Sequence, residues 1–127
     1  PAGPRVTMGI DPGYRTGCKV AVVDGTGKFL ARRTIYPTPP RQDIDRAREM
    51  LVELIAMYEV QLIAIGNGTA SRETDAFVGQ VLKDLGKVRD PDNMPTKVMV
   101  SESGASIYSA SELAAAGFPW RPSFASL

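Results

Sequence analysis

The sequence predicts one α/β domain, built as a mixed five-stranded sheet with helices on its faces in the order β-β-β-α-β-α-β-α. Three short apolar segments, joined by tight turns, open the chain, and helical and strand-like segments alternate after "PTPP". The chain has 127 residues, of which 43% are hydrophobic. This length and composition suit a single domain spanning residues 1–127 with a real core.

The first three segments predict an antiparallel meander. We expect strands at Val6–Ile10, Cys18–Val23 and Phe29–Tyr36. "DPGYRTG" supplies the first turn, because proline fixes φ and glycine allows positive φ. "DGTG" at 24–27 is typical of a hairpin turn. The third strand carries two adjacent arginines and suits a sheet edge.

The rest of the chain alternates between helix and strand. Apolar residues at helical spacing, short apolar runs and the stop at Gly86 predict, in order, a helix at 44–58, a strand at 62–65, a helix from about 71 to 85, a strand at 97–100 and a helix near 109–116. Because the fourth and fifth strands each follow a helix, right-handed crossovers make them parallel to the first strand. The first strand then lies at the centre.

Polar residues follow the parallel strands where each one ends. Asp11 ends the first strand, Asn67 follows the fourth, and Ser101 and Glu102 follow the fifth. The carboxyl ends of such strands meet at one edge of the sheet, where ligands collect. Mg²⁺ and Mn²⁺ prefer oxygen ligands, so Asp11 and Glu102 are the candidate metal ligands.

Composition excludes several kinds of chemistry and partner. The absence of histidine removes Ser-His-Asp and Cys-His catalysis and the usual zinc sites. Lys and Arg (15) nearly balance Asp and Glu (14), so polyanion binding would need a local patch. The single cysteine, Cys18, favours a reducing, cytoplasmic setting, and no run is apolar enough to predict a membrane span. The chain starts "PAGPRV" and ends "FPWRPSFASL", from which we expect a domain excised from a longer multidomain protein.

Three motifs carry a family resemblance. "GIDPGYRTGCKVAVVD" is similar to the opening of YqgF and RuvC domains. "IAIGNGTASRETD" and "VSESGASIYSASELAAAGFP" resemble more specifically the YqgF-like domain of the Tex family of transcription accessory proteins, and the resemblance covers Val6–Pro119. It implies a ribonuclease H-like fold and a protein that carries nucleic-acid-binding modules.

The resemblance also implies a cluster of acids of the RuvC nuclease type. Asp11 matches the acid that ends the first strand, and Glu102 matches an acid after the fifth strand. Asn67 stands where a second acid is expected, and an amide is a poor substitute for a metal-bound carboxylate. Glu73 and Glu112 are weaker candidates for the remaining positions. The departure at Asn67 predicts a catalytically degenerate nuclease fold.

The expected function is therefore nucleic-acid association, by binding or scaffolding, within a Tex-like protein. Arg15, Lys19, Asn67 and Arg72 are the candidate contacts to nucleic acid, with RNA or DNA and neighbouring domains as partners. Such a domain requires no cofactor. Solvated charge explains Arg15 and Lys19 equally well. A helix start capped by Thr69 or Ser71 explains Ser71, Glu73 and Asp75 well, but explains Gly66, Asn67 and Gly68 less well.

Two enzymatic alternatives remain. One is an active Mg²⁺-dependent RuvC-type nuclease or resolvase that uses Asp11 and Glu102, with Mg²⁺ or Mn²⁺ as its cofactor. The other is a phosphotransferase of the actin and Hsp70 type, which also begins with an Asp-Gly hairpin. The chain is short for the usual two lobes of that class.

Overall fold

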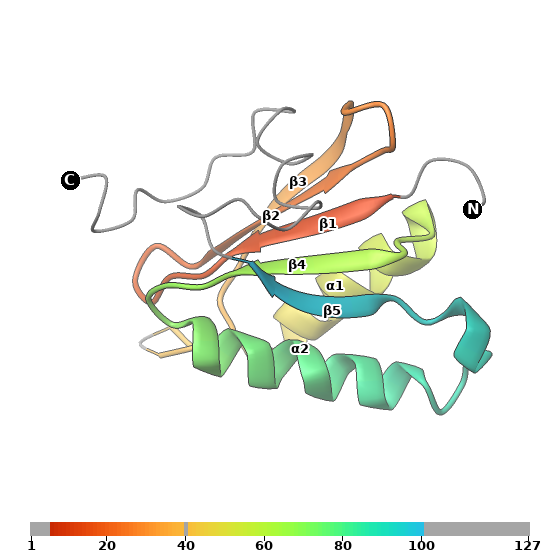
Figure 1. Ribbon diagram of the computed structural model, residues 1–127. Helices are drawn as coiled ribbons and strands as arrows, with labels where there is room; N and C mark the ends of the chain where they lie inside the picture. The colour runs from red at the N-terminus through yellow and green to blue at the C-terminus, as the bar shows by residue number, and fades with distance from the viewer. Residues whose placement is uncertain (1–5, 40, 101–127) are drawn as a thin grey trace.

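The computed structural model describes residues 6–39 and 41–100, and within them helices and strands alternate as expected. The elements are β1 (Thr7–Asp11), β2 (Cys18–Val23), β3 (Phe29–Ile35), α1 (Ile44–Tyr58), β4 (Leu62–Gly66), α2 (Ser71–Leu85), the 3-10 turn η1 (Pro91–Asn93) and β5 (Thr96–Val100) (Figure 1). The predicted order is confirmed through its fifth strand. The expected helix near 109–116 lies outside the described residues.

The sheet has five strands in the order β3-β2-β1-β4-β5, so β1 is central as predicted. β1 pairs antiparallel with β2 and parallel with β4, and β4 pairs parallel with β5. The carboxyl ends of β1, β4 and β5 therefore share one edge, on the left in Figure 1. We call it the carboxyl edge.

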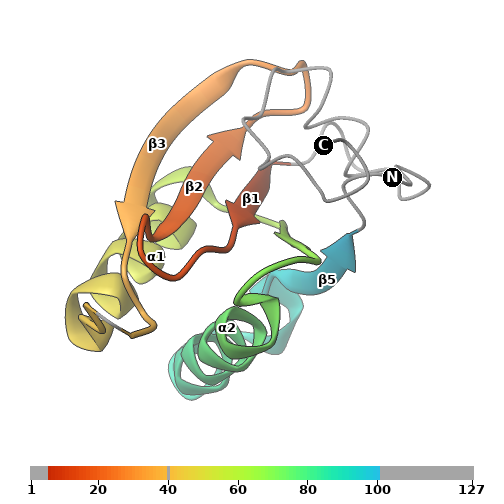
Figure 2. The same ribbon diagram turned by 90° about the vertical axis from the view of Figure 1, so that its left-hand side faces the viewer.

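Both described helices pack on the same face of the sheet (Figure 2). Alternate strand residues point toward them, which gives one core cluster of fully buried side chains that includes Met8, Ile10, Val20, Ile63, Ile65, Leu51, Leu54, Ile55 and Val78. Burying each large aliphatic side chain contributes about 1.5–3 kcal/mol. The opposite face carries a second, smaller cluster of Ala21, Val23, Ala64 and Val100. Ile10, Ile65 and Val100, at or near the ends of β1, β4 and β5, belong to these clusters, so core packing fixes the positions of the strands at the carboxyl edge.

The β2–β3 hairpin turn is held by Asp24. Its Oδ1 accepts hydrogen bonds from the backbone N–H of Thr26 (2.9 Å) and Lys28 (3.0 Å), and from the Thr26 hydroxyl (2.6 Å). The Thr26 hydroxyl bond is the main reason that the pKa of Asp24 lies below its ordinary value. Gly27 completes the turn at φ +93°, as the "DGTG" motif predicts.

The start of α2 corrects one expectation. The N-cap is Ala70, in the left-handed region at φ +64°, and no side chain caps the helix. Capping by Thr69 or Ser71 is therefore wrong. Ser71 begins the helix instead, and its backbone N–H donates to the carbonyl of Gly68 (3.1 Å). The turn is closed by backbone hydrogen bonds and not by a side-chain cap.

No helix within residues 6–39 and 41–100 has the length and apolar character needed to cross a bilayer.

Candidate nucleic-acid interface

Asp11 lies at the carboxyl end of the central strand, and its side chain is only 1% exposed. Lys19 stands directly opposite on β2, on the same face of the sheet, and is exposed. A buried carboxylate is costly unless it is paired or hydrogen-bonded. The strand register therefore places Lys19 across from Asp11, the candidate metal ligand.

The β1–β2 loop presents Tyr14 and Arg15 to solvent. The loop returns to the sheet through Gly17, which is buried at φ +79°. A Cβ built on Gly17 would lie 2.7 Å from Cε1 of Tyr36 and 2.8 Å from the carbonyl oxygen of Ile35. Only glycine fits this close approach without movement of its neighbours. The packing fixes the base of the loop that carries Arg15.

A hydrogen bond joins this loop to α2. The Tyr14 hydroxyl donates to Oε2 of Glu73 at 2.7 Å. The bond lowers the pKa of Glu73 below its ordinary value and raises the pKa of Tyr14. Glu73 also sits in the first turn of α2, where a carboxylate is favoured by the helix dipole. The Glu73 carboxylate thus connects the β1–β2 loop to the first turn of α2.

The β4–α2 loop is tied to the end of β5. The backbone N–H of Asn67 donates to the carbonyl of Val100 at 2.8 Å, and the Ser71 hydroxyl donates to Oδ1 of Asn67 at 3.5 Å. Behind the loop, Cys18 Sγ lies 3.4 Å from Oγ1 of buried Thr74. These contacts link the ends of β4 and β5, and connect β2 to α2.

The sequence-predicted contacts gather at this edge. Arg15 lies in the β1–β2 loop, and Lys19 is the second residue of β2. Asn67 follows β4, and Arg72 lies in the first turn of α2. All four residues are exposed. Their role in binding stays a prediction. Glu102 and Glu112, the other candidate acids, lie outside the described residues.

The described part of the edge does not make a metal site by itself. Within residues 6–39 and 41–100, no group of three or more His, Cys, Asp or Glu side chains is placed to hold an ion. Asp11 is the buried carboxylate at this edge, Asn67 offers an amide, and Glu73 accepts from Tyr14. A Mg²⁺ site here would need further oxygen ligands.

Two arginines stack on aromatic rings, one within β3 and one in the connection that follows it. The guanidinium carbon of Arg32 lies 4.1 Å from the ring centroid of Phe29, and that of Arg41 lies 4.2 Å from the ring centroid of Tyr36. Both distances are within the range of cation–π attraction. Stacking orders each arginine while its charge remains in solvent.

Arg32 and Arg33 lie on β3, the outermost strand, and Arg41 lies in the β3–α1 connection; all three are exposed, and we call them the β3 basic edge. Sequence reasoning recognised an edge strand with two arginines but missed this surface. A signal was present, since residues 25–42 contain no Asp or Glu. Tyr36 also packs against Gly17, so the β3 basic edge runs toward the loop that carries Arg15.

This strand order, with a carboxylate ending the central strand, defines an α/β domain of the ribonuclease H-like, RuvC type. A solved structure of T. thermophilus RuvC, in complex with a Holliday junction substrate, superposes with a TM-score of 0.56 at 11% sequence identity. The match covers 92% of this chain and 80% of that one. The fold predicted from the sequence is confirmed.

The chain belongs to the Tex protein YqgF-like domain family, whose model matches residues 5–122. It is 54% identical over 119 residues to Protein tex of Bordetella pertussis, covering 94% of this chain and 14% of that protein. It is 49% identical over 122 residues to Transcriptional accessory protein Tex of Neisseria gonorrhoeae, again covering 94% and 14%. The human S1 RNA-binding domain-containing protein 1 is 37% identical over 112 residues, covering 87% and 11%. The resemblance stated from the motifs is confirmed, and the chain spans about one seventh of these bacterial relatives.

Proposed function

We propose that this chain is one domain, residues 1–127, of a longer, cytoplasmic Tex-like transcription accessory protein. Its function is to bind or scaffold nucleic acid, RNA or DNA, beside the neighbouring domains of the same polypeptide. Family membership and the much greater length of the relatives support the domain assignment. The printed names of two relatives, one a transcriptional accessory protein and one containing an S1 RNA-binding domain, support the association with nucleic acid.

The identity of the residue after β4 carries the proposal that the domain binds without cleaving. In the parallel register Ile10 faces Ile65, so the ends of β1 and β4 lie side by side. The polar residue that follows β4 is Asn67, an amide where a two-metal nuclease would require a carboxylate. The first acid beyond it, Glu73, is committed to Tyr14. Metal-dependent hydrolysis is therefore disfavoured at this edge, and a binding domain needs no cofactor.

Exposed cations provide the means of binding. Arg15, Lys19 and Arg72 surround the carboxyl edge, and the β3 basic edge continues from it. Phosphate contacts of this kind supply affinity without sequence specificity. Because the net charge of the chain is only +1, we expect the domain to contribute a few contacts and the other modules to contribute most of the affinity.

The test is a salt titration of nucleic-acid affinity in the full-length protein that carries this domain. Fluorescence anisotropy with labelled single-stranded RNA and DNA compares the wild type with Arg15→Ala/Arg72→Ala. Loss of two phosphate contacts to a single strand reduces the magnitude of the slope of log K against log salt by about 1.4. The matched control is Lys83→Ala/Lys87→Ala, which removes one exposed cation from the last turn of α2 and one just beyond its end. Equal slopes in all three proteins would overturn the assignment of Arg15 and Arg72.

An active Mg²⁺-dependent nuclease is the second candidate, and the position of Asp11 at the end of β1 in a RuvC-like fold favours it. Its ligands would be Asp11 and Glu102. Calorimetric titration of Mn²⁺ into the wild type and Asp11→Asn tests this candidate. Binding that Asp11→Asn abolishes would support a working metal site, whereas equal heats in both proteins would count against it.

A further inference from the structure

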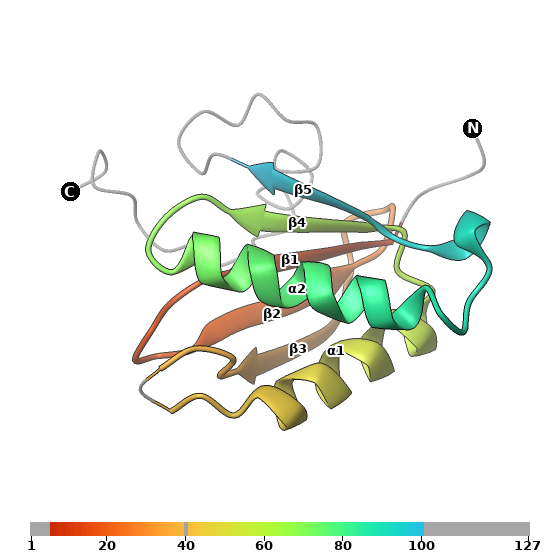
Figure 3. The same ribbon diagram turned by 90° about the horizontal axis from the view of Figure 1, so that it is seen from below.

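An asparagine followed by a glycine stands in the loop between β4 and α2. Asn67 and Gly68 come directly after β4, and both residues are exposed. Figure 3 shows this loop where the chain turns back from β4 into α2, at the carboxyl edge. The side-chain amide of an asparagine is open to attack by the backbone nitrogen of the next residue, and glycine favours this attack because it has no Cβ to shield that nitrogen. The pair is therefore a candidate site of deamidation.

The hydrogen bonds that hold the loop do not involve the two atoms that would react. The backbone N–H of Asn67 donates to the carbonyl of Val100 at 2.8 Å, and the carbonyl of Gly68 accepts from the backbone N–H of Ser71 at 3.1 Å. Within residues 6–39 and 41–100, the backbone N–H of Gly68 donates no hydrogen bond. The side-chain oxygen of Asn67 accepts from the Ser71 hydroxyl at 3.5 Å, which is longer than usual for such a bond, so the amide is only weakly held.

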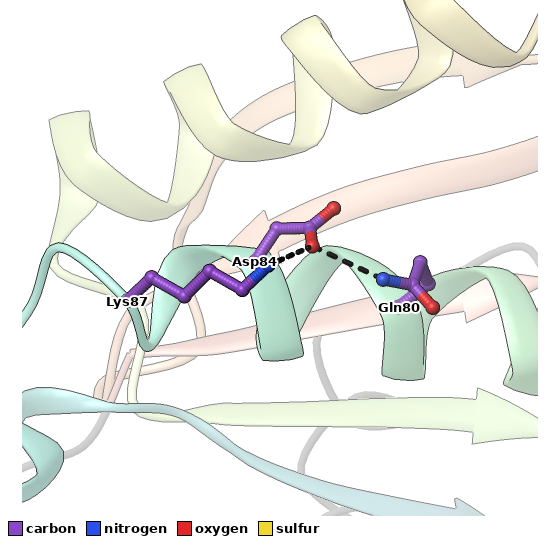
Figure 4. A network of polar contacts seen from close by, with 3 residues as sticks. All are labelled: Gln80, Asp84 and Lys87. Carbon is purple, nitrogen blue, oxygen red and sulfur yellow. Dashed lines mark hydrogen bonds and ion pairs between the residues drawn. The ribbon is translucent and has the colours of Figure 1, made fainter.

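Two other exposed amides of the chain provide the contrast. Nε2 of Gln80 donates to Oδ1 of Asp84 at 3.0 Å, and Nζ of Lys87 lies 3.7 Å from the same oxygen (Figure 4). Gln80 also lies inside α2, where the backbone N–H of the next residue is bonded along the helix. Asn93 is exposed as well, but Met94 follows it, and the side chain of methionine crowds the attacking nitrogen. We expect neither amide to react.

The reaction at Asn67 balances with water as its co-reactant. The Gly68 nitrogen forms a bond to Cγ of Asn67, the Cγ–Nδ2 bond breaks, and ammonia leaves with the proton of the Gly68 amide. Water then opens the resulting succinimide ring at either of its carbonyls. The products are aspartate and isoaspartate, in which the main chain runs through the side-chain carbonyl and is longer by one carbon. Both products carry a negative charge at neutral pH, because the ordinary pKa of an aspartate side chain is about 3.9.

We propose that Asn67 is a deamidation site, and that the carboxylate formed there weakens nucleic-acid binding at the carboxyl edge. The bond from the Asn67 N–H to Val100 keeps the new charge at this edge. The charge then stands at the same edge as the exposed cations Arg15, Lys19 and Arg72, where it lowers the local positive potential that attracts phosphate. The effect on affinity rests on the proposed function of the domain, whereas the reaction itself does not.

The first experiment ages the full-length protein that carries this domain in mildly alkaline buffer, and follows its peptides by high-resolution mass spectrometry. Digestion in heavy-oxygen water marks any product that forms during sample preparation. The expected result is conversion of Asn67 to aspartate and isoaspartate, with Asn93 and Gln80 unchanged in the same samples. An intact Asn67, or equal conversion at Asn67 and Asn93, would overturn the assignment of the deamidation site.

Gly68→Ala tests the role of the glycine nitrogen in the same assay. The variant is compatible with the backbone, because among the described glycines only Gly17 and Gly27 have a positive φ. The added methyl group crowds the nitrogen, so conversion of Asn67 should slow. Unchanged conversion in Gly68→Ala would contradict an attack by this nitrogen.

The second experiment compares Asn67→Asp, which carries the charge of the product, with Asn67→Gln, which keeps an amide. Fluorescence anisotropy measures the affinity of the full-length variants for labelled single-stranded RNA. One added charge about 4 Å from a phosphate corresponds to about a fivefold loss of affinity in water, so we expect Asn67→Asp to bind about fivefold more weakly than Asn67→Gln. The ratio should shrink as salt is added, because the effect is one of charge.

Equal affinities of the two variants, or a ratio that does not change with salt, would overturn the effect on binding. Absence of binding by the wild type and both variants would overturn the proposed function and with it this effect. The mass measurement would still decide whether Asn67 is a deamidation site, so the two failures are distinguishable.

Discussion

Replacing Gly17 with alanine should destabilise the fold by about 2–5 kcal/mol, for two reasons that can be separated. Gly17 adopts φ +79°, where an L-residue other than glycine costs about 1–2 kcal/mol. The added Cβ would also lie 2.8 Å from the Ile35 carbonyl oxygen and 2.7 Å from the Tyr36 ring. Because the carbonyl belongs to a paired strand, it cannot move freely, and such overpacking costs about 1–3 kcal/mol more.

Gly27→Ala is the matched control. Gly27 has a similar positive φ of +93°, but a Cβ built on it meets nothing within 4 Å. The free energy of unfolding of Gly27→Ala should therefore fall only by the conformational cost, about 1–2 kcal/mol. Any entropy lost from the unfolded chain is the same for both variants and cancels in the comparison.

Urea unfolding, followed by far-UV circular dichroism, measures both variants against the wild type. We expect Gly17→Ala to lose at least about 1 kcal/mol more of its free energy of unfolding than Gly27→Ala, at an unchanged m-value. Equal losses in the two variants would refute the claim that close packing at Tyr36 and Ile35 fixes the base of the β1–β2 loop.

Two further predictions concern contacts of α2. Tyr14→Phe removes the hydroxyl that lowers the pKa of Glu73, so that pKa should rise toward its ordinary value in a carbon-detected NMR titration. The pKa of Glu73 is lowered in the folded state and the pKa of Tyr14 is raised. The wild type should therefore be more stable than Tyr14→Phe near neutral pH. The difference should vanish as pH falls through the pKa of Glu73 and as pH rises through that of Tyr14; a difference independent of pH would contradict this. Lys97→Met breaks the 2.8 Å ion pair with Asp75 that ties β5 to α2 and should cost about 0.5–1 kcal/mol, less at high salt. A double-mutant cycle with Asp75→Asn that gives no coupling energy would refute it.

Most of the fold was predictable, because the spacing of apolar residues along the sequence indicates which side of each helix or strand is buried. β2 begins at Cys18 and ends at Val23, and α1 runs from Ile44 to Tyr58, as the apolar spacing predicts. The central place of β1 followed from crossover rules. The start of α2 was harder to predict from the sequence. Ala70 adopts a left-handed conformation that alanine disfavours, and backbone hydrogen bonds close the turn in place of a side-chain cap.

The site was predictable in its position but not in its contacts. Strand ends located Asp11 and Asn67 at one edge, since parallel strands share their carboxyl ends. The Tyr14–Glu73 bond joins residues 59 positions apart, and no local pattern encodes such a pair.

The measurement that bears most directly on the proposed function is a cleavage and binding assay in the same tube. Labelled single-stranded and branched DNA and RNA are incubated with excess full-length protein and Mn²⁺, using the wild type and Asp11→Asn. Native and denaturing gels then report complex formation and strand scission. We expect that both proteins form a complex and that neither cuts the nucleic acid. Scission by the wild type that Asp11→Asn abolishes would contradict it and identify an active nuclease.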